Sequence, residues 1–298
     1  MRAAVLGATG FIGRALVPAL AERGEVVAVS RSGSRPAHPG IRSLAADLTS
    51  AESTRGALEG VDVAYHLVHS LGARDFSELD RQVAENVVTE AERAGVSQLV
   101  YLGGLGDDSP DLSPHLRSRR ETGAVLSSSS VPLTTLSAAV VVGHGSAAFE
   151  TIVALVDRLP VMVAPRWVST PTQPIALADV IRYLTGVAGR SEALGESFDV
   201  GGPDVIDYGE MIRQIARLRG KRRRIVEVPV LSPRLSSYWL HLVTPVGASV
   251  ARPLVEGLRN ATVVRDDRIR ELLPFPLTSF ADAARDALGQ AGASRTRR

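Results

Sequence analysis

The chain has 298 residues, of which 45% are hydrophobic and 22% are charged, and its formal net charge is +2. These values are near the average for globular proteins, and they allow one large α/β domain or one domain with a substrate-binding part. The basic clusters at Lys221–Arg224 and Arg295–Arg298 lack the interleaved aromatic residues of a nucleic-acid surface. Together with the small net charge, this predicts a protein without a nucleic-acid partner.

Cysteine is absent, which excludes a disulfide, a thiolate nucleophile and a zinc–sulfur site. No apolar run reaches the roughly 18–20 residues that span a bilayer. The N-terminus has the pattern of a structural strand rather than that of a signal peptide. We therefore predict a cytoplasmic protein with no transmembrane segment and no metal site.

A glycine-rich turn near the N-terminus is the strongest motif in the chain. Its glycines, Gly7, Gly10 and Gly13, follow the apolar run 3–6 and lead into a segment with helical spacing of apolar residues. A helix N-terminus carries unpaired N–H groups, and glycines let the backbone approach a diphosphate closely. A second apolar run at 26–30 completes a βαβ unit of about 30 residues. This predicts a dinucleotide site, with a tight turn that binds nothing as the alternative.

The end of the second apolar run indicates which dinucleotide binds. Proteins that bind NAD usually place Asp or Glu there for the ribose 2′-hydroxyl, whereas an Arg accommodates the 2′-phosphate of NADP. Here Ser30 and Arg31 follow, with Arg35 nearby and no acid between them. A charge-assisted hydrogen bond contributes roughly 1.5–3 kcal/mol, which is about one to two decades of preference. We predict NADP, held by Ser30 and Arg31; the alternative is that the arginines are solvated loop charges.

Two later strands place polar residues at the same edge of the sheet. The predicted strand 41–46 leads into Asp47, which can bind the adenine amino group or cap a helix at 52–58. The predicted strand 61–68 leads into His69, and ligands of open α/β sheets lie outside the carboxyl ends of the strands. His69 is therefore a candidate site residue, with a loop histidine satisfied by backbone groups as the alternative.

Apolar runs and breaker residues predict the next elements. We expect a helix at 75–94 ended by Gly95, a strand at 98–102, a helix opened by Ser113 and Pro114, and a strand at 133–142. On the second of these helices, His115 and Arg119 are four residues apart and share one face.

Beyond residue 143 the order of the elements changes. We expect helices at 149–159, 177–187 and 208–218, an extended segment at 160–167, strands at 196–200 and 224–228, and proline-broken helices from 232 onward. The predicted fold class is α/β, with a doubly wound parallel sheet at 1–143 that is rejoined by about 174–202. A smaller, mostly helical C-terminal part, at 144–173 and 203–298, is expected to cap the cofactor and bind substrate.

One family resemblance is carried by Gly7-Ala8-Thr9-Gly10-Phe11-Ile12-Gly13, Asp47-Leu48, Asn86 and Ser118-Arg119, and further by the runs Tyr65–Ser70, Tyr101–Leu105 and Gln173–Ile175. These stretches together look like the short-chain dehydrogenase/reductase superfamily, and they resemble its extended and atypical branch of NAD(P)-binding, epimerase-like members. The resemblance runs through nearly the whole chain and implies an NAD(P)-binding Rossmann fold.

The resemblance also implies roles for single residues. The backbone N–H groups of Phe11 and Ile12 would bind the diphosphate, and Asn86 would border the active site. The predicted cofactor-binding residues are then Gly7, Thr9, Gly10, Phe11, Ile12, Gly13, Ser30, Arg31, Asp47, Leu48, Leu67, His69 and Gly103.

The proton relay of the superfamily is missing. Catalytically complete members have a Ser at the end of the fifth strand and a Tyr and a Lys four residues apart on the next helix. Here Gly103 takes the place of the Ser, His115 that of the Tyr, and Arg119 that of the Lys. His115 can act as general acid or base near neutral pH, whereas Arg119 stays protonated and can only donate. We predict His115, Arg119 and Asn86 as catalytic residues, with a solvent-facing His115 as the alternative.

These observations favour an NADP-dependent oxidoreductase that acts on a small carbonyl or quinone-like substrate. Tyr65, Val68, Trp167 and Trp239 are candidates for an apolar pocket lining, or else for core positions. A second hypothesis is an NADP-binding sensor or assembly protein without turnover, because the usual catalytic set is missing. A third, nucleotide-sugar epimerisation or dehydration, rests on the family alone. The resemblance further implies a homodimer.

Overall fold

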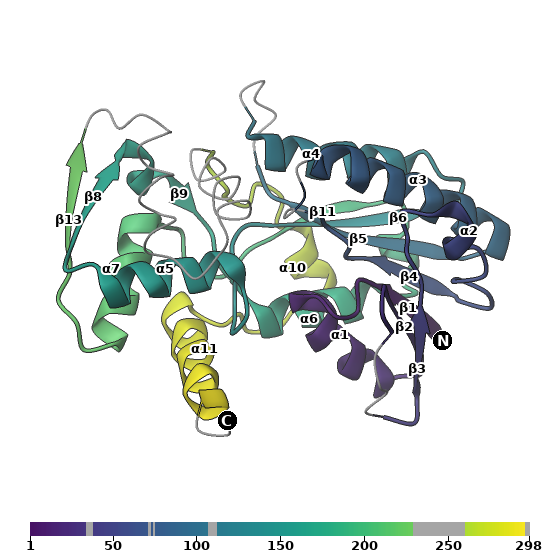
Figure 1. Cartoon of the computed structure of the whole chain (residues 1–298), viewed down its shortest axis with the longest axis horizontal. Helices are drawn as coiled ribbons and strands as arrows, with labels where there is room; N and C mark the ends of the chain where they lie inside the picture. Colours follow the sequence, from purple (N-terminus) through teal and green to yellow (C-terminus); the bar gives the residue numbers. More distant parts are fainter. Residues whose placement is uncertain (34–37, 71–72, 74, 107–111, 229–259, 296–298) are drawn as a thin grey trace.

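The computed structural model describes residues 1–33, 38–70, 73, 75–106, 112–228 and 260–295 (Figure 1). Its central feature is a seven-stranded sheet with the strand order β11-β6-β5-β4-β1-β2-β3, in which every neighbouring pair is parallel. The strands are β1 (Arg2–Leu6), β2 (Glu25–Ser30), β3 (Ile41–Ala45), β4 (Val63–His66), β5 (Gln98–Gly104), β6 (Leu133–Ala138) and β11 (Ser197–Val200). This confirms the predicted α/β class with a doubly wound sheet.

Helices cover both faces of this sheet, as Figure 1 shows. One face packs against α1 (Phe11–Ala21), α6 (Leu177–Val187) and α10 (Arg268–Leu272), and the other against α3 (Phe76–Ala94) and α4 (Pro114–Ser127). The strands read as near-continuous apolar runs because both faces are buried. The strand order reverses beside β1, whose neighbours are β2 and β4, and this is where ligands bind in open α/β sheets.

Three elements are shorter than the sequence predicts. The strand expected at 61–68 is β4 alone, and the one expected at 133–142 divides into β6 and β7 (Val141–Val142), which pairs with β10 (Ile175–Ala176). The helix expected at 52–58 is reduced to α2 (Ala51–Thr54). It ends there because Arg55 is extended and Gly56 has a φ of 82°, in the left-handed region that glycine adopts readily.

The remaining elements form a third hydrophobic cluster beside the sheet, with α5, α7, β8 and β13 at the far end of the molecule (Figure 1). They are α5 (Ala147–Arg158), β8 (Val161–Pro165), η1 (Arg166–Ser169), β9 (Pro171–Thr172), β12 (Ile206–Asp207), α7 (Tyr208–Leu218), β13 (Arg224–Val228) and α11 (Phe280–Arg295). A short η2 (Ser191–Ala193) precedes β11. None of the helices in the ranges given above is long and apolar enough to cross a membrane.

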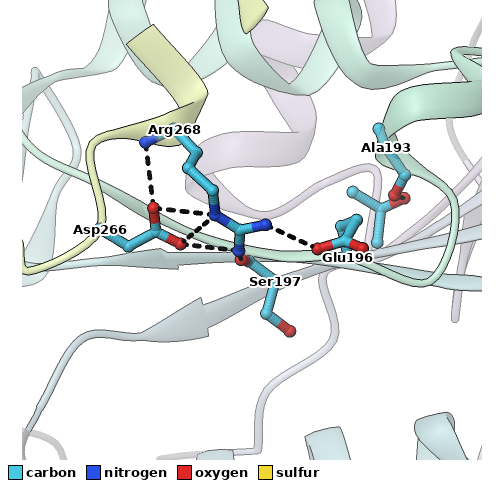
Figure 2. Close-up of polar contacts among 6 residues, drawn as sticks. Ala193, Glu196, Ser197, Asp266 and Arg268 are labelled. Atoms are coloured by element: carbon cyan, nitrogen blue, oxygen red, sulfur yellow. Dashed lines mark hydrogen bonds and ion pairs between the residues drawn. The ribbon is translucent and has the colours of Figure 1, made fainter. Parts of the chain in front are cut away.

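The segment around α10 returns to the sheet, although the sequence grouped residues 203–298 with the capping part. Ile269 is 2% exposed and packs in the cluster beneath the sheet. The guanidinium of Arg268 contacts the carboxylates of Asp266 and Glu196 and the carbonyl of Ser197, as Figure 2 shows. These bonds tie α10 to β11 at the edge of the sheet.

Gln98 connects the sheet to α6 from a fully buried position. Its amide Nε2 donates to the Thr134 hydroxyl at 2.8 Å and to the Val187 carbonyl at 3.1 Å. Its Oε1 accepts from the Gly189 N–H at 2.8 Å. One side chain therefore satisfies backbone groups at the end of α6 that would otherwise be buried without a partner.

We predict that Gln98→Leu lowers the free energy of unfolding by about 1–3 kcal/mol, because it leaves the Val187 and Gly189 groups unpaired in the interior. Chemical denaturation followed by circular dichroism measures this change. The control is Gln290→Leu at an exposed position of α11, where a shift within about 0.5 kcal/mol is expected. Equal effects of the two substitutions would contradict the assignment.

Candidate functional site

A cavity of about 620 Å³ lies at the carboxyl ends of β1, β2 and β4. The residues that line it follow the carboxyl ends of β1, β2, β3 and β4. The predicted cofactor residues among its lining are Gly7, Thr9, Gly10, Ser30, Arg31, Asp47, Leu48, Leu67 and His69. The cavity therefore coincides with the topological switch point of the sheet.

The glycine turn forms one wall of this cavity. Gly7 has a φ of 92°, and a Cβ there would meet the carbonyl of Leu67 at 3.1 Å. A Cβ on Gly13 would lie 2.3 Å from the Gly7 carbonyl oxygen, so α1 can approach the turn only at a glycine. No side chain caps the N-terminus of α1 at Gly10. The N–H groups of the first turn, which include those of Phe11 and Ile12, are therefore free for an anion.

The carboxyl end of β2 carries hydroxyl and guanidinium groups. Ser30 is 8% exposed, and its Oγ is buried with no hydrogen-bond partner in the part of the chain that the structure describes. Arg31 follows it at the exposed rim of the cavity. A buried hydroxyl without a partner is uncommon, and a ligand in the cavity would supply one. Arg35 lies outside the described residues.

Asp47 is held in its own turn. Its Oδ1 accepts from the Thr49 hydroxyl at 2.8 Å and from the Thr49 N–H at 3.1 Å, and these bonds, with a smaller contribution from Arg31, lower the pKa of Asp47. The residue that caps α2 is Ser50, whose side chain accepts from the Ser53 N–H. Asp47 therefore does not cap α2, and its contact with the adenine amino group stays a prediction.

Asn86 fixes a cavity residue without lining the cavity itself. It is half-buried in the middle of α3, and its Nδ2 donates to the Leu48 carbonyl at 2.9 Å. Leu48 belongs to the cavity lining. The contact gives Asn86 a positioning role toward the loop after β3.

Gly103 and Arg119 line a different cavity, of about 570 Å³, beside α4, β5 and β6. The guanidinium carbon of Arg119 lies 4.8 Å from the centre of the Tyr101 ring, and the Tyr101 hydroxyl donates to the Arg119 carbonyl at 2.8 Å. The side chain in the place of the superfamily Lys thus stacks on an aromatic ring. Neither Gly103 nor Arg119 is among the residues that line the cavity at the glycine turn.

A buried carboxylate that the sequence did not single out lies beside the cavity at the glycine turn. Asp80 of α3 is 2% exposed; its Oδ2 is 2.6 Å from Nδ1 of His69, and its Oδ1 accepts from the Ser70 N–H at 2.7 Å. The Ser118 hydroxyl of α4 donates to it at 3.3 Å. Burial alone would raise the pKa of Asp80, but the bonds from His69 and Ser70 outweigh it and hold that pKa below its usual value. A signal was present, because Asp80 shares the buried face of α3 with Ala84.

Two further histidines surround this carboxylate. The rings of His115 and His69 are 5.0 Å apart, so His115 faces the cluster rather than solvent. Burial, helped by the charges of His69 and Arg119, lowers the pKa of His115 to about 3. Burial likewise lowers the pKa of His66 to about 3. Both imidazoles are therefore neutral at pH 7, which argues against His115 as a cationic proton donor.

The expected apolar lining is present only in part. Val68 lines the cavity. Tyr65 of β4 is fully buried, and its hydroxyl donates to the Leu184 carbonyl of α6 at 3.0 Å. It is therefore a core residue. Trp239 and the side chain of Trp167 lie outside the described residues.

Comparisons with known proteins agree with this architecture. Residues 7–141 match the model of a family described as NAD(P)H-binding. The chain is 29% identical to (4-alkanoyl-5-oxo-2,5-dihydrofuran-3-yl)methyl phosphate reductase of Streptomyces griseus, over 93% of this chain and 95% of that protein. It is 27% identical to ceramide reductase of Caulobacter vibrioides, over 76% and 73% of the two chains. The chain is also 34% identical to 3-beta-hydroxysteroid dehydrogenase of Mycolicibacterium neoaurum. This match covers only 34% of this chain and 31% of that protein.

Solved structures show the same fold at low identity. A nucleoside-diphosphate-sugar epimerase of Staphylococcus aureus superposes with a TM-score of 0.76 at 16% identity, over 96% of this chain and 100% of that one. MoeE5, solved in complex with UDP-glucuronic acid and NAD, superposes with a TM-score of 0.73 at 18% identity, over 99% of this chain and 100% of that one. The fold and its glycine turn define a Rossmann-type protein that binds a nicotinamide dinucleotide. The match of residues 7–141 to the NAD(P)H-binding family, together with the shared fold, supports a place in the atypical branch of the short-chain dehydrogenase/reductase superfamily.

We predict that Gly13→Ala weakens cofactor binding at least tenfold, because its Cβ forces α1 away from the Gly7 carbonyl. The rise in melting temperature on addition of NADPH would shrink accordingly. The matched control is Gly289→Ala in α11, where a Cβ meets nothing within 4 Å. That variant is expected to keep the full rise and to gain up to about 1 kcal/mol of stability. An unchanged NADPH response in Gly13→Ala would contradict the role of the turn.

Proposed function

We propose that this protein is an NADP-dependent oxidoreductase that transfers hydride to or from a small carbonyl or quinone-like substrate. The observation that carries the proposal is the cavity at the glycine turn, which ends at Ser30 and Arg31 and has no acid there. The Ser30 hydroxyl is buried and has no partner within the described part of the chain, and Arg31 brings a positive charge to the rim. A ribose 2′-phosphate would accept from the Ser30 hydroxyl and bring a negative charge to Arg31, whereas a 2′-hydroxyl brings no charge.

The rest of the cavity suits the other parts of the coenzyme. The first-turn N–H groups of α1 would bind the diphosphate, and the residues after β3, Asp47 and Leu48, would border the adenine. Leu67 and His69 follow β4 on the other side of the glycine turn. When bound, the nicotinamide supplies the hydride, and the protein supplies orientation and the proton.

Two of the relatives matched over most of this chain support reduction as the reaction class, because both are named as reductases. The substrate of one of them carries alkanoyl and oxo groups in its name. The solved structures share only the fold at under 20% identity, and they add no support for sugar chemistry.

A second candidate is an NADP-binding protein without turnover. The helix α4 carries His115 and Arg119 in place of the Tyr and Lys, and Arg119 stacks on Tyr101. The chain is also 23% identical, over 93% of its length and 75% of the relative, to NADH dehydrogenase [ubiquinone] 1 alpha subcomplex subunit 9 of Arabidopsis thaliana. That relative is named as a subunit of a larger assembly.

Cofactor preference is tested by calorimetric titration with NADPH and NADH. We expect the wild-type protein to bind NADPH about 10–100-fold more tightly, which corresponds to one charge-assisted contact. Arg31→Ala is expected to remove most of this preference and to change the NADH affinity by less than about twofold. The control is Arg55→Ala, another exposed arginine that is not part of the cavity. Equal wild-type affinities for the two coenzymes would refute the NADP proposal.

Turnover is tested with a panel of small aldehydes, ketones and quinones at the absorbance of reduced nicotinamide. We expect substrate-dependent oxidation of NADPH with at least one carbonyl or quinone, and its loss in Gly13→Ala. Tight NADPH binding with no oxidation across the panel would reject the oxidoreductase and favour the binding protein.

A further inference from the structure

The hydrogen bond between Asp80 and His69 fixes the state of that imidazole. Oδ2 of Asp80 lies 2.6 Å from Nδ1 of His69, and the low pKa of Asp80 keeps the carboxylate ionised. An ionised carboxylate only accepts, so the hydrogen is on Nδ1. In the neutral ring Nε2 is then an acceptor, and in the charged ring it is a donor.

Nε2 of His69 is the open end of this pair. It is buried and has no hydrogen-bond partner among the residues that the structure describes. His69 itself lines the cavity at the glycine turn, where the coenzyme is proposed to bind. A buried ring nitrogen without a partner costs free energy, which marks a position prepared for a ligand group.

The surroundings of His69 differ from those of His115. Around His69, and around the Asp80 carboxylate that it contacts, lie Phe76 from α3, Ser118, His115 and Arg119 from α4, and His66 from β4. Asp80 is the one negative charge in this set, and it is bonded to His69. His115 has Arg119 and His69 as neighbouring positive charges, and it is neutral at pH 7. Two adjacent imidazolium ions would repel each other, and of these two rings His69 is the one that the carboxylate contacts.

We propose that His69 is the residue that exchanges the proton with the substrate oxygen, and that Asp80 is its positioning residue. This rests on the proposed oxidoreductase function. In reduction, the hydride from the bound nicotinamide forms the new C–H bond and the carbonyl π pair moves to oxygen. The Nε2–H bond of the His69 imidazolium then breaks as the O–H bond forms. His69 is left neutral, with Nδ1–H still on Asp80, and regains a proton from water; oxidation runs these steps in reverse.

The assignment gives a reason for the residues on α4. With the proton on His69, α4 needs neither a Tyr nor a Lys. Its Ser118 instead donates to Asp80, and its His115 packs against the His69 ring as a neutral group. Arg119 is then free to stack on Tyr101 away from the cavity.

The first test needs no turnover. Ring ¹⁵N shifts of His69 in the ligand-free protein report which nitrogen carries the hydrogen in the neutral form. We expect the Nδ1–H tautomer in the wild-type protein and a mixture with the Nε2–H tautomer in Asp80→Asn. A wild-type Nε2–H tautomer would overturn the proposal whatever the activity is. If Asp80→Asn does not fold, the wild-type spectrum alone still decides.

The second test separates binding from chemistry. We expect His69→Gln to bind NADPH within about threefold of the wild-type affinity, to lose at least 100-fold in kcat, and to lose the alkaline limb of the pH–rate profile for reduction, because the donor must carry its proton in that direction. Asp80→Asn is expected to lose kcat with little change in KM. The matched control is His144→Gln, at an exposed position before α5, which keeps the wild-type rate.

The remaining outcomes tell the two proposals apart. Retained turnover in His69→Gln, with a large loss in His115→Gln, would overturn the role of His69 and leave the oxidoreductase standing. A wild-type protein that binds NADPH but does not oxidise it with any substrate of the panel would overturn both proposals.

Discussion

The contact between the glycine turn and the first turn of α1 is the constraint on which the nucleotide site depends. Gly7 and Ala8 both donate to the Val29 carbonyl at 3.1 Å, which ties the turn to β2. Gly10 donates to the Gly7 carbonyl at 2.9 Å, and Gly13 passes the same oxygen where no Cβ fits. Because both ends of the turn are fixed, α1 begins at the wall of the cavity, where no side chain of the described residues caps its N-terminus.

The buried carboxylate of Asp80 provides a second fixed point on the other side of the switch point. It accepts from His69 and Ser70 in the loop after β4 and from Ser118 on α4, while its own backbone belongs to α3. A buried charge is tolerated only when it is paired and hydrogen-bonded, and here three donors do this. The loop that carries Leu67 and His69 into the cavity is thereby held against both helices of that face.

The sequence predicts most of the sheet and little of the polar cluster. Strands such as β1 and β2 are recognisable because they are buried on both faces, and the glycines of the first turn have a local geometric cause. The departure of β7 from β6 depends on pairing with β10, more than 30 residues away, which no local pattern reveals. The contact of Asp80 with Ser118 likewise joins residues 38 positions apart. The apolar pattern of α3 places Asp80 on its buried face but does not reveal which groups Asp80 meets there.

The charge balance of the cluster limits what its histidines can do. His66 and His115 stay neutral in the folded state down to about pH 3, whereas in the unfolded chain they take up protons from about pH 6.5. Between these values the unfolded state binds more protons, so each of the two rings lowers the stability of the fold as the pH falls. His69 differs because its proton also satisfies the buried Asp80. Three imidazoles that lie close together therefore have unequal surroundings, because the buried carboxylate of Asp80 is hydrogen-bonded to His69 alone among them.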